Sequence, residues 1–154
     1  AAQSFDWPRF CLGLKGLLDE YPMGATRIRF EIGRFISAAC GYYVMQVLDI
    51  KSSHGELFAI GRGGTHHFRT PAAQGHDHPF TVVRGNQPAQ ISDQRVTLVG
   101  QLCTPKDVLA RQQPVAQLAI GDLLVFTLAG AYAWNISHQN FLMHEPPLKA
   151  FIEG

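Results

Sequence analysis

The stretch VGQLCTPKDVLARQQPVAQLAIGDLLVFTLAGAY, residues 99–132, decides the fold because short apolar runs in it alternate with turn residues. The run DLLVFTLAG begins at a Gly121-Asp122 turn and is rich in residues that favour strands. The piece at 107–113, DVLARQQ, is interpreted as helical or turn-like. We therefore expect a β-domain here. Cys103, the single cysteine of the stretch, is either a working thiol or a small core residue.

The chain on both sides of this stretch contains further strand-like runs. Runs rich in β-branched and aromatic residues lie at 42–50, 56–62, 78–84, 94–102 and 149–154. Gly, Pro, Asn and Asp residues separate these runs at fairly regular spacing, as turns require. The sequence therefore predicts a mainly β fold whose main domain is an antiparallel barrel or sandwich.

The N-terminal part has a different pattern. Residues 7–20 carry apolar side chains at helical spacing, and Pro22 and Gly24 end that helix. The run TRIRFEI at 26–32 alternates and is predicted to be a strand, whereas residues 35–41, rich in small side chains, are predicted to be helical or bent. A helix followed by a single strand is typical of the tail of a larger α/β unit.

Composition narrows the functional classes. The chain has 154 residues, of which 46% are apolar and 16% charged, as expected for one folded domain with a real core. The net charge of +1 and the lack of a basic cluster give no indication of nucleic acid or membrane partners. We find no transmembrane run and no signal peptide. Cys11, Cys40 and Cys103 lack metal-ligand spacing, which favours reduced thiols and a cytoplasmic location.

The stretch GGTHHFRTPAAQGHDHPF concentrates four histidines, His66, His67, His76 and His78. In a strand, the last two would share one face, which a metal site could use. Residues 79–85 offer no carboxylate to complete such a site. A polar loop beside a cleft is therefore the alternative interpretation.

Three other side chains each allow two interpretations. Arg34, in the motif EIGR, follows a glycine that lets a backbone approach a ligand, and its guanidinium suits a phosphate, but it could equally form a surface ion pair. Cys103 is either buried or presented at a strand edge by the turn that contains Pro105. Tyr132 can be a core residue whose hydroxyl is satisfied.

Five motifs taken in order are more specific than any one of these residues: EIGR, GG-x-HH, Cys103 followed by TPKD, GDLL and GAY. Together they resemble the C-terminal half of the pyridoxal-phosphate decarboxylases that share the alanine racemase fold, among them diaminopimelate, ornithine and arginine decarboxylases. The resemblance covers about residues 5–152. It implies that residues 1–36 are the terminal elements of a cofactor-binding (β/α)8 barrel and that residues 37–154 are the C-terminal β-domain.

The resemblance implies pyridoxal 5'-phosphate as the cofactor. Glu31 takes the place of the family glutamate that meets the pyridine nitrogen, although Ile32 replaces the proline of the family motif. Gly33 and Arg34 match the residues beside the cofactor phosphate, and Tyr132 matches a tyrosine whose hydroxyl also contacts it. The cofactor-binding residues are thus expected to be Glu31, Gly33, Arg34 and Tyr132.

The resemblance also assigns a catalytic role and a homodimer. Cys103 matches a cysteine that crosses from the partner subunit and returns a proton to the carbon that loses carbon dioxide. Asp107 matches an aspartate that holds this loop, and we count it among the expected substrate-binding residues. None of the lysines stands in the family's Schiff-base motif, so we expect this piece alone to be inactive.

The departures from the family motifs bear on the substrate. Thr104 stands where relatives carry an acidic partner for a distal ammonium, and Thr70 stands where diaminopimelate enzymes carry an arginine. CTPKD, GG-x-HH and FLMHEPP resemble instead a subgroup that acts on larger amino-acid conjugates in siderophore biosynthesis. The side chains expected at the distal end of the substrate are His66, His67, His76, His78 and His144.

We therefore expect decarboxylation of a citryl-amino-acid conjugate or a similar polycarboxylate, since histidines suit carboxylates. Two alternatives stay open: a non-catalytic dimerisation or interaction module of the same fold, and a His-rich metal-binding β-barrel.

Overall fold

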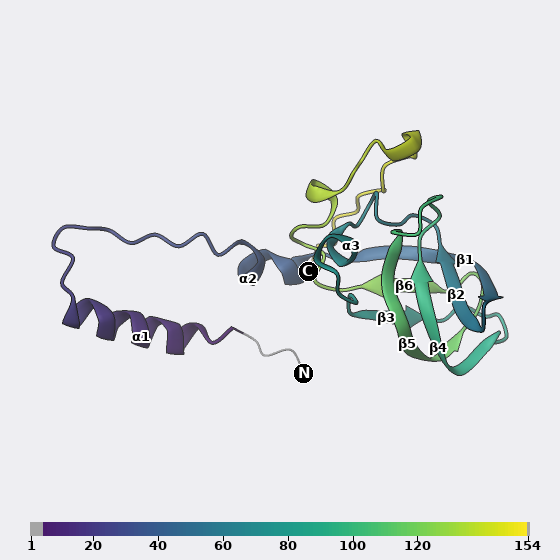
Figure 1. Ribbon diagram of the computed structural model, residues 1–154, viewed down its shortest axis with the longest axis horizontal. Coiled ribbons are helices and arrows are strands. Elements are labelled where there is room, and N and C mark those ends of the chain that lie inside the picture. The colour runs from purple at the N-terminus through teal and green to yellow at the C-terminus, as the bar shows by residue number, and fades with distance from the viewer. Residues whose placement is uncertain (1–4, 154) are drawn as a thin grey trace.

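The computed structural model describes residues 5–153 and combines three short helices with one six-stranded sheet (Figure 1). The helices are α1 (Trp7–Glu20), α2 (Gly33–Ser37) and α3 (Thr70–Gln74). Single 3-10 turns lie at Ala38–Cys40, Trp134–Ile136 and Phe141–Met143. The strands are β1 (Tyr43–Ser53), β2 (Glu56–Gly61), β3 (Phe80–Val83), β4 (Ile91–Val99), β5 (Val108–Leu118) and β6 (Leu123–Phe126).

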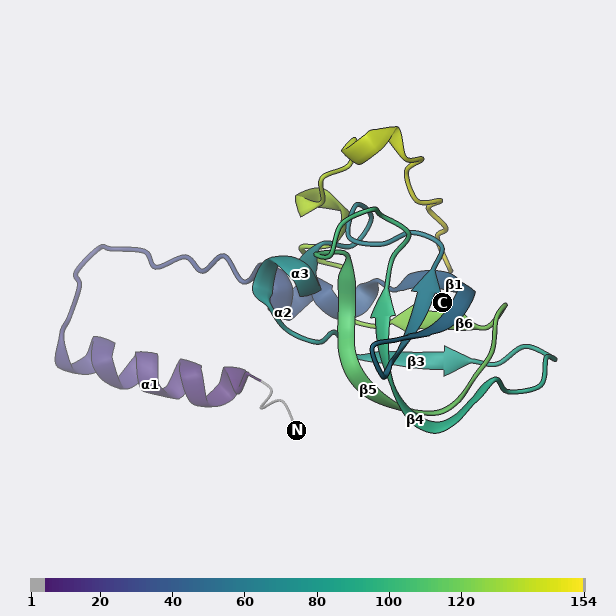
Figure 2. The same cartoon turned by 45° about the vertical axis from the view of Figure 1, so that its right-hand side comes forward.

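The sheet has the order β3-β6-β1-β2-β4-β5 and curls round on itself (Figures 1 and 2). Four of its five strand pairs are antiparallel, but β2 and β4 are parallel, with Leu57 opposite Val96 and Ile60 opposite Val99. The predicted mainly β, antiparallel domain is confirmed, and the structure differs from that prediction only at this parallel pair. The long connection through α3 and β3 returns the chain to the end of the sheet where β2 begins, and β4 therefore runs in the same direction as β2. Parallel neighbours require a crossover connection of this kind.

The curl of the sheet originates in β1. The first half of this strand pairs with β6 and the second half with β2, and the register shifts between Val47 and Asp49. A bulge of this kind bends a strand and increases its twist. One strand thus serves two parts of the sheet and turns it toward a barrel.

The core fills the inside of this curled sheet. Alternate residues of the first half of β1, Tyr43, Met45 and Val47, point inward, as the period of two demands. They pack with fully buried side chains from the other strands and from the loop before α3, among them Phe68, Val96, Leu98, Leu109, Leu124 and Phe126. Each such side chain contributes roughly 1.5–3 kcal/mol through burial, so this cluster stabilises the domain.

The N-terminal helix forms as predicted. Asp6 accepts a 2.9 Å hydrogen bond from the backbone of Arg9, and Pro8 lies in the first turn, where its missing N–H costs nothing. The predicted strand at 26–32 does not form, and this segment runs back along α1 as extended chain. A strand needs a hydrogen-bonded partner, and the described residues supply none for this segment.

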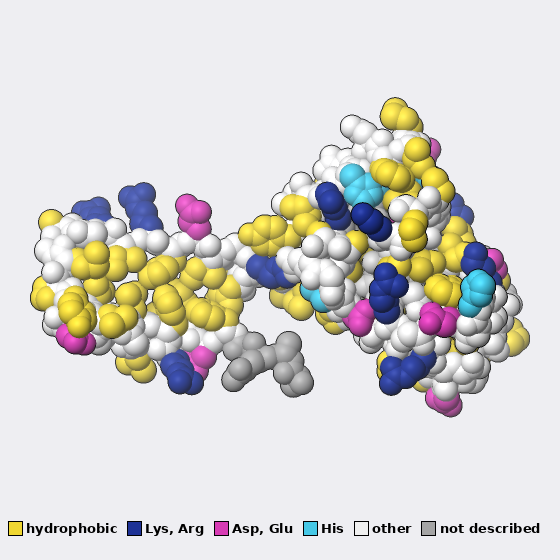
Figure 3. Space-filling model, in the orientation of Figure 1, with side chains coloured by type: hydrophobic (Ala, Val, Ile, Leu, Met, Phe, Trp, Pro, Cys, Tyr) yellow, Lys and Arg dark blue, Asp and Glu magenta, His cyan; other side chains and the backbone are white. Residues whose placement is uncertain are grey.

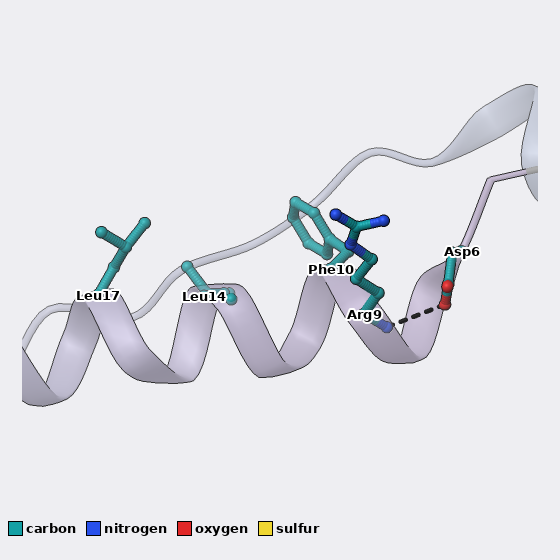
Figure 4. Close-up of a pocket in the computed structure, with 6 residues that line it drawn as sticks. Asp6, Arg9, Phe10, Leu14 and Leu17 are labelled. Carbon is teal, nitrogen blue, oxygen red and sulfur yellow. Dashed lines mark hydrogen bonds between the residues drawn. The ribbon is translucent and has the colours of Figure 1, made fainter.

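The helix α1 and the returning segment project away from the sheet, and no α1 residue is buried (Figures 1 and 2). Hydrophobic side chains gather where the two run side by side (Figure 3), with the rings of Phe10 and Phe30 5.2 Å apart. A groove on this helix is lined by Asp6, Arg9, Phe10, Gly13, Leu14 and Leu17 (Figure 4). This groove contains none of the residues that the sequence predicts to bind cofactor or substrate.

Two further predictions differ from the structure. The piece at 107–113 is not helical, because Val108 begins the longest strand of the β4–β5 hairpin. The run at 149–153 forms neither a helix nor a strand in the part of the chain that the structure describes. None of the described helices has the length and apolar character needed to cross a bilayer.

Candidate functional site

Arg34 and Tyr132 lie together, although one precedes the first strand and the other follows the last. The guanidinium carbon of Arg34 is 5.1 Å from the centre of the Tyr132 ring, within range of a cation–π contact. Gly33 faces the phenol, because a side chain at this position would begin 3.8 Å from the Tyr132 hydroxyl. The structure thus brings together three of the four residues expected to bind the cofactor. Glu31 lies exposed just before α2.

The guanidinium of Arg34 is incompletely satisfied. Its Nη1 donates a 3.3 Å hydrogen bond to Gln74, whereas Nη2 is buried and has no hydrogen-bond partner. No ion pair joins Arg34 to a carboxylate anywhere in residues 5–153, so the interpretation as a surface ion pair loses its support. A buried donor without a partner is costly and marks a place where an anion would fit.

The GAY motif is positioned by close backbone packing. A side chain on Gly130 would collide with the carbonyl oxygen of Ser37 and with the backbone of Gly41, so only glycine fits. The N–H of Gly130 donates to the Ala38 carbonyl at 2.9 Å. These contacts press the segment after β6 against the turn after α2, and Tyr132 therefore arrives beside Arg34.

Tyr132 itself adopts a left-handed backbone conformation, with φ of 54°. Such a conformation is unfavourable for a residue with a large side chain, so surrounding contacts must hold it. The buried hydroxyl of Thr70 donates a hydrogen bond to the Tyr132 carbonyl. Tyr132 as a whole is 44% exposed.

Cys103 is exposed on the loop between β4 and β5, so it is not a core residue. Asp107 holds this loop. Its buried carboxylate accepts hydrogen bonds from the backbone N–H groups of Thr65 at 2.7 Å and Leu102 at 2.8 Å. Gly64 packs directly on this carboxylate and has no room for a side chain. Asp107 therefore anchors the loop, and its buried position favours this role over a direct contact with substrate.

The histidines divide into two groups. The rings of His67 and His144 each lie tilted against the ring of His66, with centres 3.9 Å and 5.1 Å from it. His67 Nε2 lies 2.7 Å from the Glu145 carbonyl and its Nδ1 lies 3.3 Å from the Tyr43 hydroxyl, so both ring nitrogens are engaged. We call His66, His67 and His144 the histidine cluster.

Within the histidine cluster, His66 is fully buried and neither of its ring nitrogens has a hydrogen-bond partner. Burial lowers the pKa of His66 to about 4, and the neighbouring His67, His144 and His138 act in the same direction. His66 is therefore neutral at neutral pH. It keeps one N–H donor and one acceptor without a protein partner.

The second group, His76 and His78, lies in the loop after α3 and not in a strand. His78 is buried and bonds the Thr127 carbonyl at 2.6 Å, and burial lowers its pKa. His76 is exposed, and its Nε2 lies 3.1 Å from Gln74 Oε1. Within residues 5–153 no three His, Cys, Asp or Glu side chains are placed to hold a metal ion, so the metal-binding alternative has no geometric support.

Comparison with known families identifies the domain. Residues 21–130 match the family model of the pyridoxal-dependent decarboxylase C-terminal sheet domain. The chain belongs to this family. The match spans the sheet, the Arg34 motif, the Cys103 loop and Gly130.

Relatives with assigned names include a 2-[(L-alanin-3-ylcarbamoyl)methyl]-2-hydroxybutanedioate decarboxylase from Staphylococcus aureus, which is 48% identical over 149 residues. That alignment covers 93% of this chain and 37% of the relative. An L-glutamyl-[BtrI acyl-carrier protein] decarboxylase from Niallia circulans is 34% identical over 80% of this chain and 30% of its own. The chain thus spans about a third of the length of these relatives.

Solved structures show the same fold. The diaminopimelate decarboxylase of Helicobacter pylori, in complex with L-lysine, has a TM-score of 0.75 at 24% identity and covers 89% of this chain and 32% of its own. The lysine/ornithine decarboxylase of Vibrio vulnificus, in complex with cadaverine, has a TM-score of 0.73 at 22% identity over 90% of this chain and 36% of its own. At this identity the likeness establishes the architecture of the sheet domain.

Sequence reasoning missed two residues of this sheet domain, Thr70 and Gln74, which hold Tyr132 and Arg34. Thr70 was considered only as a departure from a family motif. The signal available in the sequence was weak: a threonine followed by proline is typical of a helix start. Nothing in the sequence indicates which carbonyl that threonine binds.

Proposed function

We propose that this chain is the C-terminal domain of a pyridoxal-phosphate-dependent decarboxylase that acts on a carboxylate-rich amino-acid conjugate in siderophore biosynthesis. The observation that carries the proposal is the pair formed by Arg34 and Tyr132, with a buried guanidinium N–H that lacks a partner. The 48% identity with the hydroxybutanedioate decarboxylase of S. aureus supports the choice of reaction.

The residues present fit the proposed cofactor. A phosphate accepts hydrogen bonds from a guanidinium and a phenol, and the glycine at 33 leaves room for it beside the Tyr132 hydroxyl. When bound, pyridoxal phosphate supplies a ring that accepts the electrons left behind by carbon dioxide. Arg34 and Tyr132 would hold the phosphate, and the Glu31 carboxylate would hold a proton on the ring nitrogen.

Cys103 is proposed to hold the proton that replaces the lost carboxyl group. Cys103 is exposed on the loop that Asp107 ties down, so its thiol is free to serve a site outside this subunit. A thiol is suited to this step because its ordinary pKa, about 8.5, allows proton exchange near neutral pH. We propose that the site is completed across a homodimer, with Cys103 serving the partner subunit.

The histidine cluster is proposed to meet the carboxylates at the far end of the substrate. His66 is neutral and its ring nitrogens have no protein partner, so its N–H is available to donate to a carboxylate. Thr104 supplies no carboxylate for a second ammonium. Both features favour a polycarboxylate over a diamine.

The test is a comparison of substrates with the full-length enzyme loaded with pyridoxal phosphate. Carbon dioxide release would be measured with the citryl-type conjugate of 2,3-diaminopropionate, with diaminopimelate and with ornithine. We expect the highest kcat/KM for the conjugate. A higher value for either diamine would reject the substrate proposal, and no release from any of the three would reject the decarboxylase itself.

A further inference from the structure

The helix α3 contacts both members of the Arg34–Tyr132 pair, one at each end. Its first residue, Thr70, donates a hydrogen bond from its hydroxyl to the Tyr132 carbonyl. Its last residue, Gln74, accepts a 3.3 Å hydrogen bond from Arg34 Nη1. Because these two residues are four apart, a single helical turn spaces them.

The position of α3 is itself fixed from several sides. Pro71 is buried in its first turn, and Gly75 ends the helix in the left-handed conformation, with φ of 65°. The N–H of Arg69, directly before the helix, donates to the Ser137 hydroxyl at 3.1 Å. The helix is thus tied both to the sheet domain and to the segment that follows Tyr132.

The contacts of Thr70 and Gln74 differ in what they restrain. Thr70 is buried, and its bond holds the backbone of a residue in an unfavourable left-handed conformation. Gln74 is exposed and restrains a long side chain that would otherwise sample many rotamers. His76 Nε2, 3.1 Å from the same Gln74 oxygen, steadies that amide.

We infer that Thr70 and Gln74 are positioning residues that hold Tyr132 and Arg34 in register to bind one phosphate. The inference rests on the proposed function of that pair as the phosphate site of pyridoxal phosphate. Neither residue touches the cofactor; each acts through the side chain it holds. The helix α3 therefore sets the spacing of Arg34 and Tyr132, the two residues proposed to bind the phosphate.

The experiment compares Thr70→Val and Gln74→Leu with wild type in the full-length enzyme. The equilibrium dissociation constant for pyridoxal phosphate is measured by absorbance titration, and the phosphorus NMR resonance of the bound cofactor is recorded. Each substitution removes one hydrogen bond, so each should weaken cofactor binding about three- to tenfold and shift the phosphorus resonance. Thr70→Ser, which keeps the hydroxyl, should restore both properties.

Ala72→Ser is the matched control, because Ala72 is exposed on the same helix. It should leave affinity and resonance unchanged. Gln74 is exposed, so Gln74→Leu tests the inference even if Thr70→Val impairs folding. Wild-type affinity and resonance in Gln74→Leu and in any folded Thr70→Val would overturn the inference.

Two reference variants separate this inference from the proposed function. If Arg34→Gln and Tyr132→Phe also bind pyridoxal phosphate as wild type does, the phosphate site itself is wrong, and the inference is rejected with it. If these two variants weaken binding while Thr70→Val and Gln74→Leu do not, only the role of α3 is rejected.

Discussion

The buried carboxylate of Asp107 accepts a 2.8 Å hydrogen bond from the backbone of Leu102, the residue directly before Cys103. Its other oxygen accepts from the backbone of Thr65 at 2.7 Å. One side chain therefore ties the thiol loop to the glycine-rich segment that leads into the histidine cluster. Together with the backbone of Gln101, which donates to the Gly63 carbonyl at 2.8 Å, this carboxylate holds the loop of the proposed proton donor.

Asp107→Asn should loosen the thiol loop, because an amide offers one acceptor oxygen where the carboxylate offered two. Hydrogen exchange at the amide of Thr65 or Leu102 should become about tenfold faster or more in the full-length protein. Asp93→Asn is the matched control, since Asp93 is exposed. Unchanged exchange at both amides in Asp107→Asn would show that the loop is held by other contacts.

Cys103→Ser should lower kcat while leaving the affinity for pyridoxal phosphate unchanged. A hydroxyl is a far weaker proton donor than a thiol near neutral pH, and loss of a positioned acid reduces the rate about 100-fold or more. The readouts are steady-state turnover and cofactor titration. Cys11→Ser, at a second free cysteine, should behave as wild type.

The same variant tests whether the site is shared between subunits. Cys103→Ser and Arg34→Gln are each expected to be nearly inactive as homodimers. In a mixed dimer, one site combines the intact Arg34 of one subunit with the intact Cys103 of the other. Random mixing in equal amounts should restore about a quarter of wild-type activity. No recovery after verified subunit exchange would place both residues in one subunit's site.

His66 should make the folded state less stable as pH falls. Its pKa is about 4 in the folded protein and about 6.5 when unfolded, so the unfolded state binds more protons between these values. The contribution is fully present above pH 6.5 and is lost progressively as pH falls to about 4. The thermal midpoint should therefore drop less between pH 7 and pH 5 in His66→Asn than in wild type. His54→Asn, at an exposed histidine, is the control. If the thermal midpoint of His66→Asn depends on pH as that of wild type does, the lowered pKa of His66 is contradicted.

Gly130→Ala should disrupt the segment that presents Tyr132. The added methyl group collides with the Ser37 carbonyl, and backbone cannot move aside as a flexible side chain can. We expect a lower thermal midpoint and weaker cofactor binding. Gly16→Ala, in open space on α1, should instead be neutral or stabilising by about 0.5–1 kcal/mol. Equal stability and cofactor affinity of the two variants would count against the packing described here.

Most strands of the domain could be predicted from the sequence, because they are runs rich in β-branched and aromatic residues that turn residues separate. The strand at Val108–Leu118 could not, since Arg111, Gln112, Gln113 and Pro114 give it little intrinsic strand preference. Its pairing with β4 overrides that preference. The parallel pairing of β2 and β4 likewise depends on how the chain crosses the sheet, which no local pattern reveals.

Within the candidate site, the sequence predicted only the residues that lie in recognisable motifs. The EIGR and GAY motifs pointed to Arg34 and Tyr132, and the structure places them in contact. The roles of Thr70 and Gln74 arise from hydrogen bonds across the fold, and side chains of these types form such bonds in many settings. The full burial of His66, flanked by its neighbours in the histidine cluster, is also a tertiary effect.

The affinity of the full-length enzyme for pyridoxal phosphate, with and without the Arg34 guanidinium, tests the central claim most directly. Hydrogen bonds to a charged group contribute about 1.5–3 kcal/mol, so Arg34→Gln should weaken cofactor binding roughly 10- to 150-fold. Tyr132→Phe should weaken it less, and Arg27→Gln, at an exposed arginine, should not change it. Binding of pyridoxal phosphate by Arg34→Gln at wild-type strength would contradict the account.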